Sequence, residues 1–326
     1  MTLCKRRSII VPSQKRGTAT RKKKKKMKKI IALILIATLA LFALCSCKKT
    51  SEDESLSAAY NKAIEAINYN PNDYTETLTV AISPDFAPME FYDTETDSIV
   101  GFDVILATYL AKELGMKLVL DPMSFDACMA AVASGSADLA ISGFSWTAER
   151  AETFLISDYY VAGENETEQI LITTAGKASQ FTAGKTDFSG LKIGAQGGSL
   201  QELLVMEQLV TKGATIELYE NINVAATALA TGDIDALAVA HGNGEALASD
   251  TIVLSDYFFE VDEKYKNNVI LLNKNDTALL EAVNAALAKA MAANVYDGWY
   301  EACQIYAEVK TLDELGYDDE GNKITE

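Results

Sequence analysis

The residue types best suited to hold a small anion gather in two short stretches of this chain. The first stretch ends in Arg150, whose guanidinium offers a planar, two-pronged set of donors that fits a carboxylate. Ser142, Gly143 and Ser145 precede it at the exit of an apolar run, where hydroxyls and main-chain groups can accept from an ammonium or donate to a carboxylate. The alternatives are a solvated arginine and a turn that bonds to its own backbone.

The second stretch is Gly197-Gly198-Ser199, which opens a helical pattern. A helix N-terminus presents free N–H groups and a partial positive charge, which suits an anion. We therefore expect Ser199 and the main-chain N–H of Leu200 to meet a carboxylate. The alternative for Ser199 is a plain N-cap, and the two roles can coexist.

Composition and charge narrow the function classes. The chain has 326 residues, of which 49% are hydrophobic and 23% charged, a globular composition whose length suggests about two domains. Residues 1–47 carry 13 of the 29 Lys and Arg residues and no acid, so residues 48–326 have a net charge of −30. An acidic body repels phosphate, which argues against nucleic-acid binding. One His and five Cys make a multi-ligand zinc site improbable, and no cofactor is expected.

The basic head is typical of a targeting segment. A positive run at 21–29 precedes the apolar stretch 30–44, which is too short to span a bilayer comfortably and suits a secretory signal peptide over 1–46. Leu44 and the small Ser46 before Cys47 resemble a bacterial lipobox, so Cys47 is the expected lipidation site. An uncleaved N-terminal anchor is the alternative, and Met27 is a more ordinary start for such a peptide than Met1.

The body alternates strand-like and helical patterns. Apolar runs with the character of strands alternate with helical spacings that end at a glycine, the usual helix C-terminal signal. The expected strands are 78–82, 117–120, 137–141, 191–195, 215–219, 235–239 and 269–273. One helix is expected to begin at Asp103, and the others are expected over 125–134, 199–212, 223–231, 276–293 and 296–309. Such alternation predicts an α/β fold with two lobes, each a mostly parallel sheet with helices on both faces. A cleft between the lobes is the natural ligand site.

Seven motifs follow one another along the body: SPDFAPMEF (83–91), VGFDVILATYLAKELG (100–115), MSFDACMAAVASGSADLAISGFSWTAER (123–150), ISDYY (156–160), QGGSLQE (196–202), GDIDALAV (232–239) and LLEAVNAALAKAMAANVYDGWYE (279–301). Together they resemble one family, the extracytoplasmic solute-binding proteins of polar amino-acid ABC importers. The resemblance implies the type II periplasmic-binding-protein fold, a two-lobed clamp with two hinge-crossing strands near 160–163 and 267–270. It implies residues 78–160 plus 269–312 as one lobe and 163–267 as the other. Residues 47–77 are expected to form a tether and short extension, and 313–326 a polar tail.

The resemblance also assigns roles in the cleft. It places Arg150 on the ligand carboxylate, with the Gly143 carbonyl and the Ser145 hydroxyl facing the ligand. It matches Phe86 and Phe125 to positions where aromatic rings sandwich the ligand, although a lone Phe is more often a core residue. Phe144 and Trp146 are expected in the core, Glu90 is expected to be structural, and Asp233 and Asp235 are expected at a helix end and a strand start rather than on the ligand.

Two features depart from the family pattern. The family usually has an Asp for the ligand ammonium five residues after Asp235, where this chain has Ala240 followed by His241. A buried ammonium without a carboxylate is costly, so either Asp85 or Asp126 compensates, His241 takes part, or the ligand is not an ordinary α-amino acid. The second departure is the long acidic crossover at 161–169, which borders the cleft or is a solvated loop.

We therefore expect a monomeric, lipid-anchored binding protein outside the cytoplasmic membrane that passes an amino-acid-like solute to ABC permease and ATPase subunits. A solute-sensing receptor module is the first alternative. A cyclohexadienyl-dehydratase-like enzyme is the second, with Glu202, Asp85 and His241 as its candidate acid or base residues. Cys128 and Cys303 are expected to be buried thiols or, alternatively, a disulfide.

Overall fold

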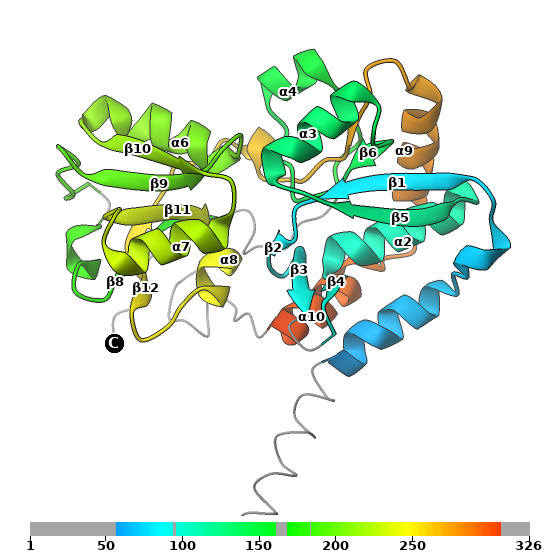
Figure 1. Ribbon diagram of the computed structural model, residues 1–326, viewed down its shortest axis with the longest axis horizontal. Coiled ribbons are helices and arrows are strands. Elements are labelled where there is room, and N and C mark those ends of the chain that lie inside the picture. Colours follow the sequence, from blue (N-terminus) through cyan, green and yellow to red (C-terminus); the bar gives the residue numbers. More distant parts are fainter. Residues whose placement is uncertain (1–56, 94–95, 161–167, 183, 308–326) are drawn as a thin grey trace, which may run out of the picture. The chain divides into compact units, whose positions relative to one another are not determined.

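Two five-stranded sheets, each covered by helices, organise the part of the chain that the structure describes (Figure 1). The computed structural model describes residues 57–93, 96–160, 168–182 and 184–307. The predicted signal peptide, the lipidation site Cys47, most of the acidic crossover and the C-terminal tail lie outside these residues. We call the elements around the first sheet lobe 1 and those around the second sheet lobe 2.

The sheet of lobe 1 has the strand order β5-β1-β6-β13-β7. Its strands are β1 (Thr77–Ile82), β5 (Lys117–Pro122), β6 (Leu139–Ala140), β7 (Leu155–Ile156) and β13 (Leu271–Leu272). Strand β1 pairs in parallel with β5 and β6, whereas β13 runs antiparallel to β6 and β7.

Helices cover both faces of this sheet because its strand residues alternate between two apolar clusters. Leu78, Val80 and Leu139 face one cluster, while their neighbours Ala81 and Ala140 face the other. The first cluster receives α2 (Phe102–Leu114), α9 (Thr277–Ala292), α10 (Tyr296–Ala307) and a helix at 57–67, and the second receives α3 (Phe125–Ser134). Period-two alternation on a strand thus gives both faces a core.

A small sheet that the sequence did not predict extends lobe 1. It consists of β2 (Asp85–Phe86), β3 (Glu90–Asp93) and β4 (Ser98–Val100), all antiparallel. Gly101 follows β4 with φ 124°, and a Cβ there would lie 2.3 Å from the Met89 carbonyl oxygen. Only glycine fits this turn into α2, because the conformation and the close backbone approach both exclude a side chain.

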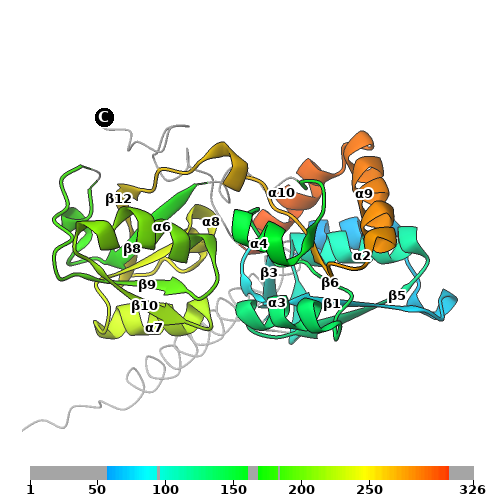
Figure 2. The same ribbon diagram turned by 90° about the horizontal axis from the view of Figure 1, so that it is seen from above.

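The sheet of lobe 2 has the order β10-β9-β11-β8-β12. Its strands are β8 (Gln169–Thr174), β9 (Lys192–Gln196), β10 (Thr215–Tyr219), β11 (Ala236–Ala240) and β12 (Ile252–Phe258). Its helices are α6 (Leu200–Gln208), α7 (Ile222–Thr231) and α8 (His241–Ala246), and 3-10 turns occur at Ala178–Gln180, Val210–Lys212 and Glu263–Tyr265. Helices α6 and α7 pack on opposite faces, since Leu171 and Ala238 join the cluster of α6 while Ile170 and Val239 join that of α7 (Figure 2).

Both sheets are mixed, so the prediction of mostly parallel sheets is wrong in this respect. In lobe 2, β9 pairs in parallel with β10 and β11, but β8 runs antiparallel to β11 and β12. Strands β8 and β13 each follow a passage of the chain from one lobe to the other. Parallel pairing is expected when a helical crossover connects consecutive strands of one sheet. A strand that enters its sheet from the other lobe has no such crossover before it, so it is not constrained to run parallel to its neighbours. At the passage, Asn268 forms isolated bridges with Ser145 and Tyr160.

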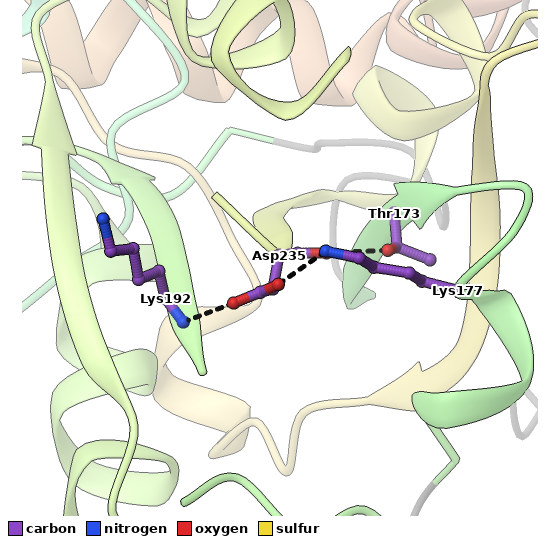
Figure 3. A network of polar contacts seen from close by, with 4 residues as sticks. All are labelled: Thr173, Lys177, Lys192 and Asp235. Carbon is purple, nitrogen blue, oxygen red and sulfur yellow. Dashed lines mark hydrogen bonds and ion pairs between the residues drawn. The ribbon is translucent and has the colours of Figure 1, made fainter. Parts of the chain in front are cut away.

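Asp235 immediately precedes β11 and links three strands of lobe 2 through its hydrogen bonds (Figure 3). Its carboxylate accepts from Lys177 Nζ at 2.6 Å and from the Lys192 main-chain N–H at 2.9 Å, and its carbonyl accepts from Thr173 Oγ1 at 2.7 Å. Burial opposes ionisation here, but the bonds from Lys177 and Lys192 outweigh it and lower the pKa of Asp235. Asp235 is therefore a structural residue at a strand start, as predicted.

Among the described helices, no single one is long and apolar enough to cross a membrane, although α9 and α10, bent by 85° at their junction, pass that test as a pair.

Candidate functional site

The loop that follows β6 is fixed by hydrogen bonds to two buried carboxyl groups. Ser142 Oγ accepts from the Ser83 main-chain N–H at 2.9 Å and donates to Glu90. The Gly143 N–H donates to Asp103 Oδ2 at 2.8 Å. Glu90 is thus structural, as predicted, and with Asp103 it fixes the two loop residues that face the cavity described below.

These two carboxyl groups have perturbed ionisation. Burial raises the pKa of Asp103 to about 7, although hydrogen bonds from Gly143, Tyr160 and Glu90 act in the opposite direction. Burial, and then the charge of Asp103, raise the pKa of Glu90 well above its ordinary value. Two buried carboxyls side by side do not ionise together easily, so the pair retains a proton near neutral pH.

Gly143 has a positional requirement of its own. Its φ is 56°, and a Cβ at this position would lie 2.7 Å from Cε1 of Phe86. The ring of Phe86 therefore lies flush against the main chain of the loop. Only a glycine allows this approach without displacing the ring.

Arg150 brings a buried cation to the end of the same loop. It lies on α4 (Ala148–Thr153), which Thr147 caps through its side chain. Its guanidinium lies 5.5 Å from the ring centre of Phe125 and 5.2 Å from that of Phe144. Nη1 donates to the Ser145 carbonyl and Nη2 to the Gly198 carbonyl at 2.7 Å.

The charge of Arg150 has no carboxylate partner among the ion pairs of the described residues. Arg150 is only 5% exposed, and burial lowers its pKa to about 10. Two of its five N–H groups serve the two carbonyls, which leaves three for another acceptor. A buried cation of this kind is best completed by an anion.

Ser199 precedes α6 and caps it through its side chain, while Glu202 reaches back to the residue before the cap. Ser199 Oγ accepts from the Glu202 main-chain N–H at 3.2 Å and donates to the Gln196 carbonyl at 2.7 Å, while the Glu202 side chain accepts from the Gly198 N–H at 2.7 Å. The N-cap interpretation of Ser199 is therefore confirmed. Because Ser199 Oγ takes the Glu202 N–H, only part of the N–H groups of this helix end are left for another acceptor.

A cavity lies where these elements meet, with walls from both lobes. Eight of the predicted site residues line it: Phe86, Phe125, Ser142, Gly143, Ser145, Arg150, Ser199 and Leu200. Five more lining residues were not predicted: Gln169, Gln196, Gln201, Ile222 and Asn268. The enclosed volume of this cavity is about 30 Å³, and the space within its lining is about 450 Å³ when the open solvent at its mouth is included.

Some of the lining residues that were not predicted are marked by a sequence motif, and others are not. Gln196 and Gln201 flank the Gly197-Gly198-Ser199 stretch, so their position was available from the motif. Gln169 starts β8 and Asn268 lies at the return passage between lobes, and only the tertiary structure brings them to the cavity. In the cavity wall, Gln201 Nε2 donates to Gln169 Oε1 at 2.6 Å.

Four predicted site residues are not part of this lining: Asp85, Gly198, Ala240 and His241. Gly198 contributes its carbonyl to Arg150 and lines a neighbouring groove that Arg150 and Ser199 share. Ala240 is buried at the end of β11, where its strand partner is Gln169.

His241 begins α8 inside lobe 2 rather than at the ligand cavity. Its ring stacks on Phe258 with centroids 6.0 Å apart, and Nδ1 lies 3.4 Å from Glu245 Oε1. Burial lowers the pKa of His241 to about 4. The hypothesis that His241 takes part in ligand binding is not supported by this placement, because the ring is enclosed within the lobe.

Asp85 lies behind the cavity wall instead of facing the cavity. Its Oδ2 accepts from the Ile222 main-chain N–H at 2.8 Å and from Gln196 Nε2 at 3.1 Å, and Ser83 Oγ donates to its Oδ1 at 3.0 Å. Burial raises the pKa of Asp85, and these hydrogen bonds lower it in part. The other candidate for a compensating carboxylate, Asp126, is exposed and bonds to Ser124.

The residues that were expected in the core of lobe 1 lie there. Phe144 is fully buried against Phe125, while Trp146 is half-buried against the same cluster. Cys128 and Cys303 are buried free thiols, so the disulfide alternative is wrong. No group of three or more His, Cys, Asp and Glu side chains suited to a metal occurs in the described ranges.

Comparison with known proteins decides which family has this arrangement. The model of the bacterial extracellular solute-binding proteins, family 3, matches residues 78–302. The chain belongs to this family. Its fold is the two-lobed α/β type II periplasmic-binding-protein fold.

Several known proteins are similar to this solute-binding protein. A probable histidine-binding protein of Campylobacter jejuni is 26% identical over 81% of this chain and 93% of that protein. The lysine/arginine/ornithine-binding periplasmic protein of Escherichia coli is 28% identical over 68% of this chain and 85% of that protein. The crystal structure of an amino acid ABC transporter substrate-binding protein from Streptococcus pneumoniae, bound to L-arginine, superposes with a TM-score of 0.63 at 29% identity, covering 76% of this chain and all of that one. These relatives are binding proteins and not enzymes.

Proposed function

We propose that this solute-binding protein captures an amino acid or a close analogue by its carboxylate and delivers it to an ABC permease. The observation that carries the proposal is Arg150, a buried guanidinium at the wall of a two-lobed cavity with donors to spare. The names of the relatives, a probable histidine-binding protein and a lysine/arginine/ornithine-binding protein, and the L-arginine in the Streptococcus pneumoniae structure support an amino acid as the solute.

The other contacts follow from the cavity lining. The carboxylate bonds to Arg150 and to the main-chain N–H of Leu200, while Phe86 and Phe125 contact the apolar part of the ligand. Ser142, Ser145 and the Gly143 carbonyl accept from its amine. In place of an aspartate at Ala240, the amides of Gln169 and Gln201 supply neutral acceptors in the same wall.

Capture requires the lobes to close around the solute. We propose that residues 78–160 with 269–312 and residues 163–267 act as the two jaws. Because Arg150 belongs to one jaw and Ser199 and Leu200 to the other, a bound carboxylate contacts both. A ligand that contacts both jaws shifts the equilibrium toward the closed form.

A thermal-shift screen of the purified protein against all common amino acids tests this function. L-arginine and agmatine form the decisive pair, since agmatine lacks only the carboxylate. We expect amino acids, but not agmatine, to raise the melting temperature, and Arg150→Ala to abolish the shift. A ligand at 100 times its dissociation constant stabilises the fold by about 2.7 kcal/mol, which such a screen detects easily. Equal shifts with L-arginine for the wild type and for the Arg150→Ala variant would disprove the carboxylate site.

We further propose that a lipid on Cys47 anchors the mature protein outside the cytoplasmic membrane. The sequence around Cys47 supports this, since a small residue precedes it after an apolar stretch. Cys47→Ser should move the protein from the membrane fraction to the soluble fraction, whereas Cys45→Ser, the matched control two residues earlier, should not. Retention of the Cys47→Ser protein in membranes would favour an uncleaved anchor.

A further inference from the structure

A carboxylate of lobe 1 reaches the start of a helix in lobe 2. Asp85 lies on β2, which pairs with β3 in the small sheet of lobe 1. Its Oδ2 accepts from the N–H of Ile222, the first residue of α7, and from the side chain of Gln196 at the end of β9. Both partners belong to lobe 2.

The neighbouring residue strengthens the same junction. Phe86 packs against the apolar cluster of lobe 1 and also against the cluster of lobe 2 that contains Ile222. Phe86, Gln196 and Ile222 all line the cavity. The junction made by β2 therefore sets the distance between walls of the cavity that come from different lobes.

We propose that Asp85 is a positioning residue that aligns lobe 2 on lobe 1 when the clamp closes, through the N–H of Ile222 and the amide of Gln196. This role goes beyond carboxylate capture and rests on the proposed function only for its effect on ligand release. Asp85 acts here on the protein itself and not on the ligand, which differs from the compensating role considered from the sequence.

The chemistry of the contact suits such a role. The N–H of the first helical residue has no acceptor within its own helix, so it needs a partner from outside or water. A carboxylate at a helix N-terminus is also favoured by the partial positive charge there. Ser83, on lobe 1, donates to the other oxygen and so keeps the carboxylate directed at lobe 2. When the lobes separate, water replaces the lobe 2 donors while the bond to Ser83 stays.

The contact can be broken from either side. Asp85→Ala removes the acceptor. Ile222→Pro removes the donor, because proline has no N–H and is tolerated at the first position of a helix. Asn221 has φ −139° and ψ 135°, an extended conformation compatible with a following proline. Ile222→Val is the matched control, since it also shortens the side chain but keeps the N–H.

The second control is the same substitution, Asp to Ala, at a carboxylate that does not join the two lobes. Asp138 accepts from the Thr79 N–H at 2.7 Å, and both residues belong to lobe 1. Asp138→Ala therefore removes a carboxylate-to-backbone bond that does not join the lobes. It is expected to leave the closure of the clamp unchanged.

Three measurements on the purified full-length chain test the proposal. Amide hydrogen exchange at Ile222 should become about tenfold faster in Asp85→Ala than in the wild type, because its N–H loses a charged acceptor. The radius of gyration from small-angle scattering should rise in Asp85→Ala and in Ile222→Pro, with or without saturating L-arginine, and the double variant should show no further rise. Dissociation of L-arginine should be about tenfold faster in both single variants.

The outcomes separate the two proposals. Unchanged Ile222 exchange and superimposable scattering of wild type, Asp85→Ala and Ile222→Pro would overturn the positioning role. Equal changes of scattering in Ile222→Val, or of any of the three measurements in Asp138→Ala, would overturn it as well. Failure of the wild-type chain to bind L-arginine or any other amino acid would count against the proposed function alone, since exchange and scattering need no ligand.

Discussion

The buried carboxyl Asp103 makes the stability of this protein depend on pH in a direction opposite to that of most surface acids. Its pKa rises from 3.8 to about 7 on folding, chiefly because of burial. Between these values the folded state holds a proton that the unfolded state has lost. The free energy of unfolding therefore falls as pH rises from about 4 to 7 and levels off above that range.

The size of the effect follows from the shift. Each pH unit in this window is worth about 1.4 kcal/mol for one group, so the free energy of unfolding should fall by roughly 2 kcal/mol between pH 5 and pH 7 on account of Asp103 alone. Glu90 adds to the fall, because its pKa is raised as well, by burial and then by the charge of Asp103. Tyr160 and Cys303 also face this pair, but burial raises the pKa of both, so they stay neutral in this range.

Urea unfolding at pH 5, 6 and 7, followed by circular dichroism, measures the dependence. Asp103→Asn keeps an oxygen for the Gly143 N–H and removes one of the two titrating groups, so its unfolding free energy should fall less than that of the wild type, with the remaining fall due to Glu90. Asp121→Asn, the same substitution on the exposed strand β5, is the control and should retain the wild-type slope. If Asp103→Asn and the wild type showed the same slope, the assigned ionisation of Asp103 would be wrong.

Three further predictions concern other sites. Gly143→Ala should lower the free energy of unfolding by about 1–2 kcal/mol in urea titrations, because φ is 56° and the new Cβ meets Phe86; a loss below about 0.5 kcal/mol would contradict the described contact. Lys177→Ala should cost at most about 1 kcal/mol, since its ion pair with Asp235 is partly exposed, while Lys185→Ala, exposed on the same lobe, should cost nothing measurable. Cys128 and Cys303 should resist alkylation at pH 8 until urea unfolds the chain, because burial raises the pKa of both thiols; mass spectrometry of their peptides before and after unfolding decides this.

Much of the helical framework was predictable because local signals mark it. The predicted helix 125–134 coincides with α3, and Gly135 caps it with φ 77° and bonds to Ala131 and Val132. The predicted helix 199–212 is interrupted instead, since α6 ends at Gln208 and a 3-10 turn covers Val210–Lys212. Strands were predicted too long where the chain leaves the sheet early, as in β6, which is confined to Leu139–Ala140.

The small sheet β2-β3-β4 and the mixed pairing could not be inferred in the same way. The strands of this sheet have only two to four residues, too few for a periodic pattern. The antiparallel strands β8 and β13 acquire their neighbours only after the chain passes between lobes, which no local pattern records. At the cavity, the motif residues were predicted, whereas Gln169 and Asn268 reach it only through the tertiary structure. The junction of Asp85 likewise depends on distant parts of the chain, since Asp85 and Gln196 are more than 100 positions apart.

The strand order of the two sheets has a consequence for the sequence of events during synthesis. All five strands of lobe 2 lie within Gln169–Phe258, so this lobe is one uninterrupted stretch of chain. Lobe 1 instead has β13 between β6 and β7, and that strand comes from Leu271–Leu272. A chain that emerges from its N-terminus can therefore complete lobe 2 while lobe 1 still waits for a central strand and for α9 and α10. Until these segments are made, the apolar sheet of lobe 1 is unfinished, and exposed apolar surface and unpaired strand edges of this kind favour aggregation.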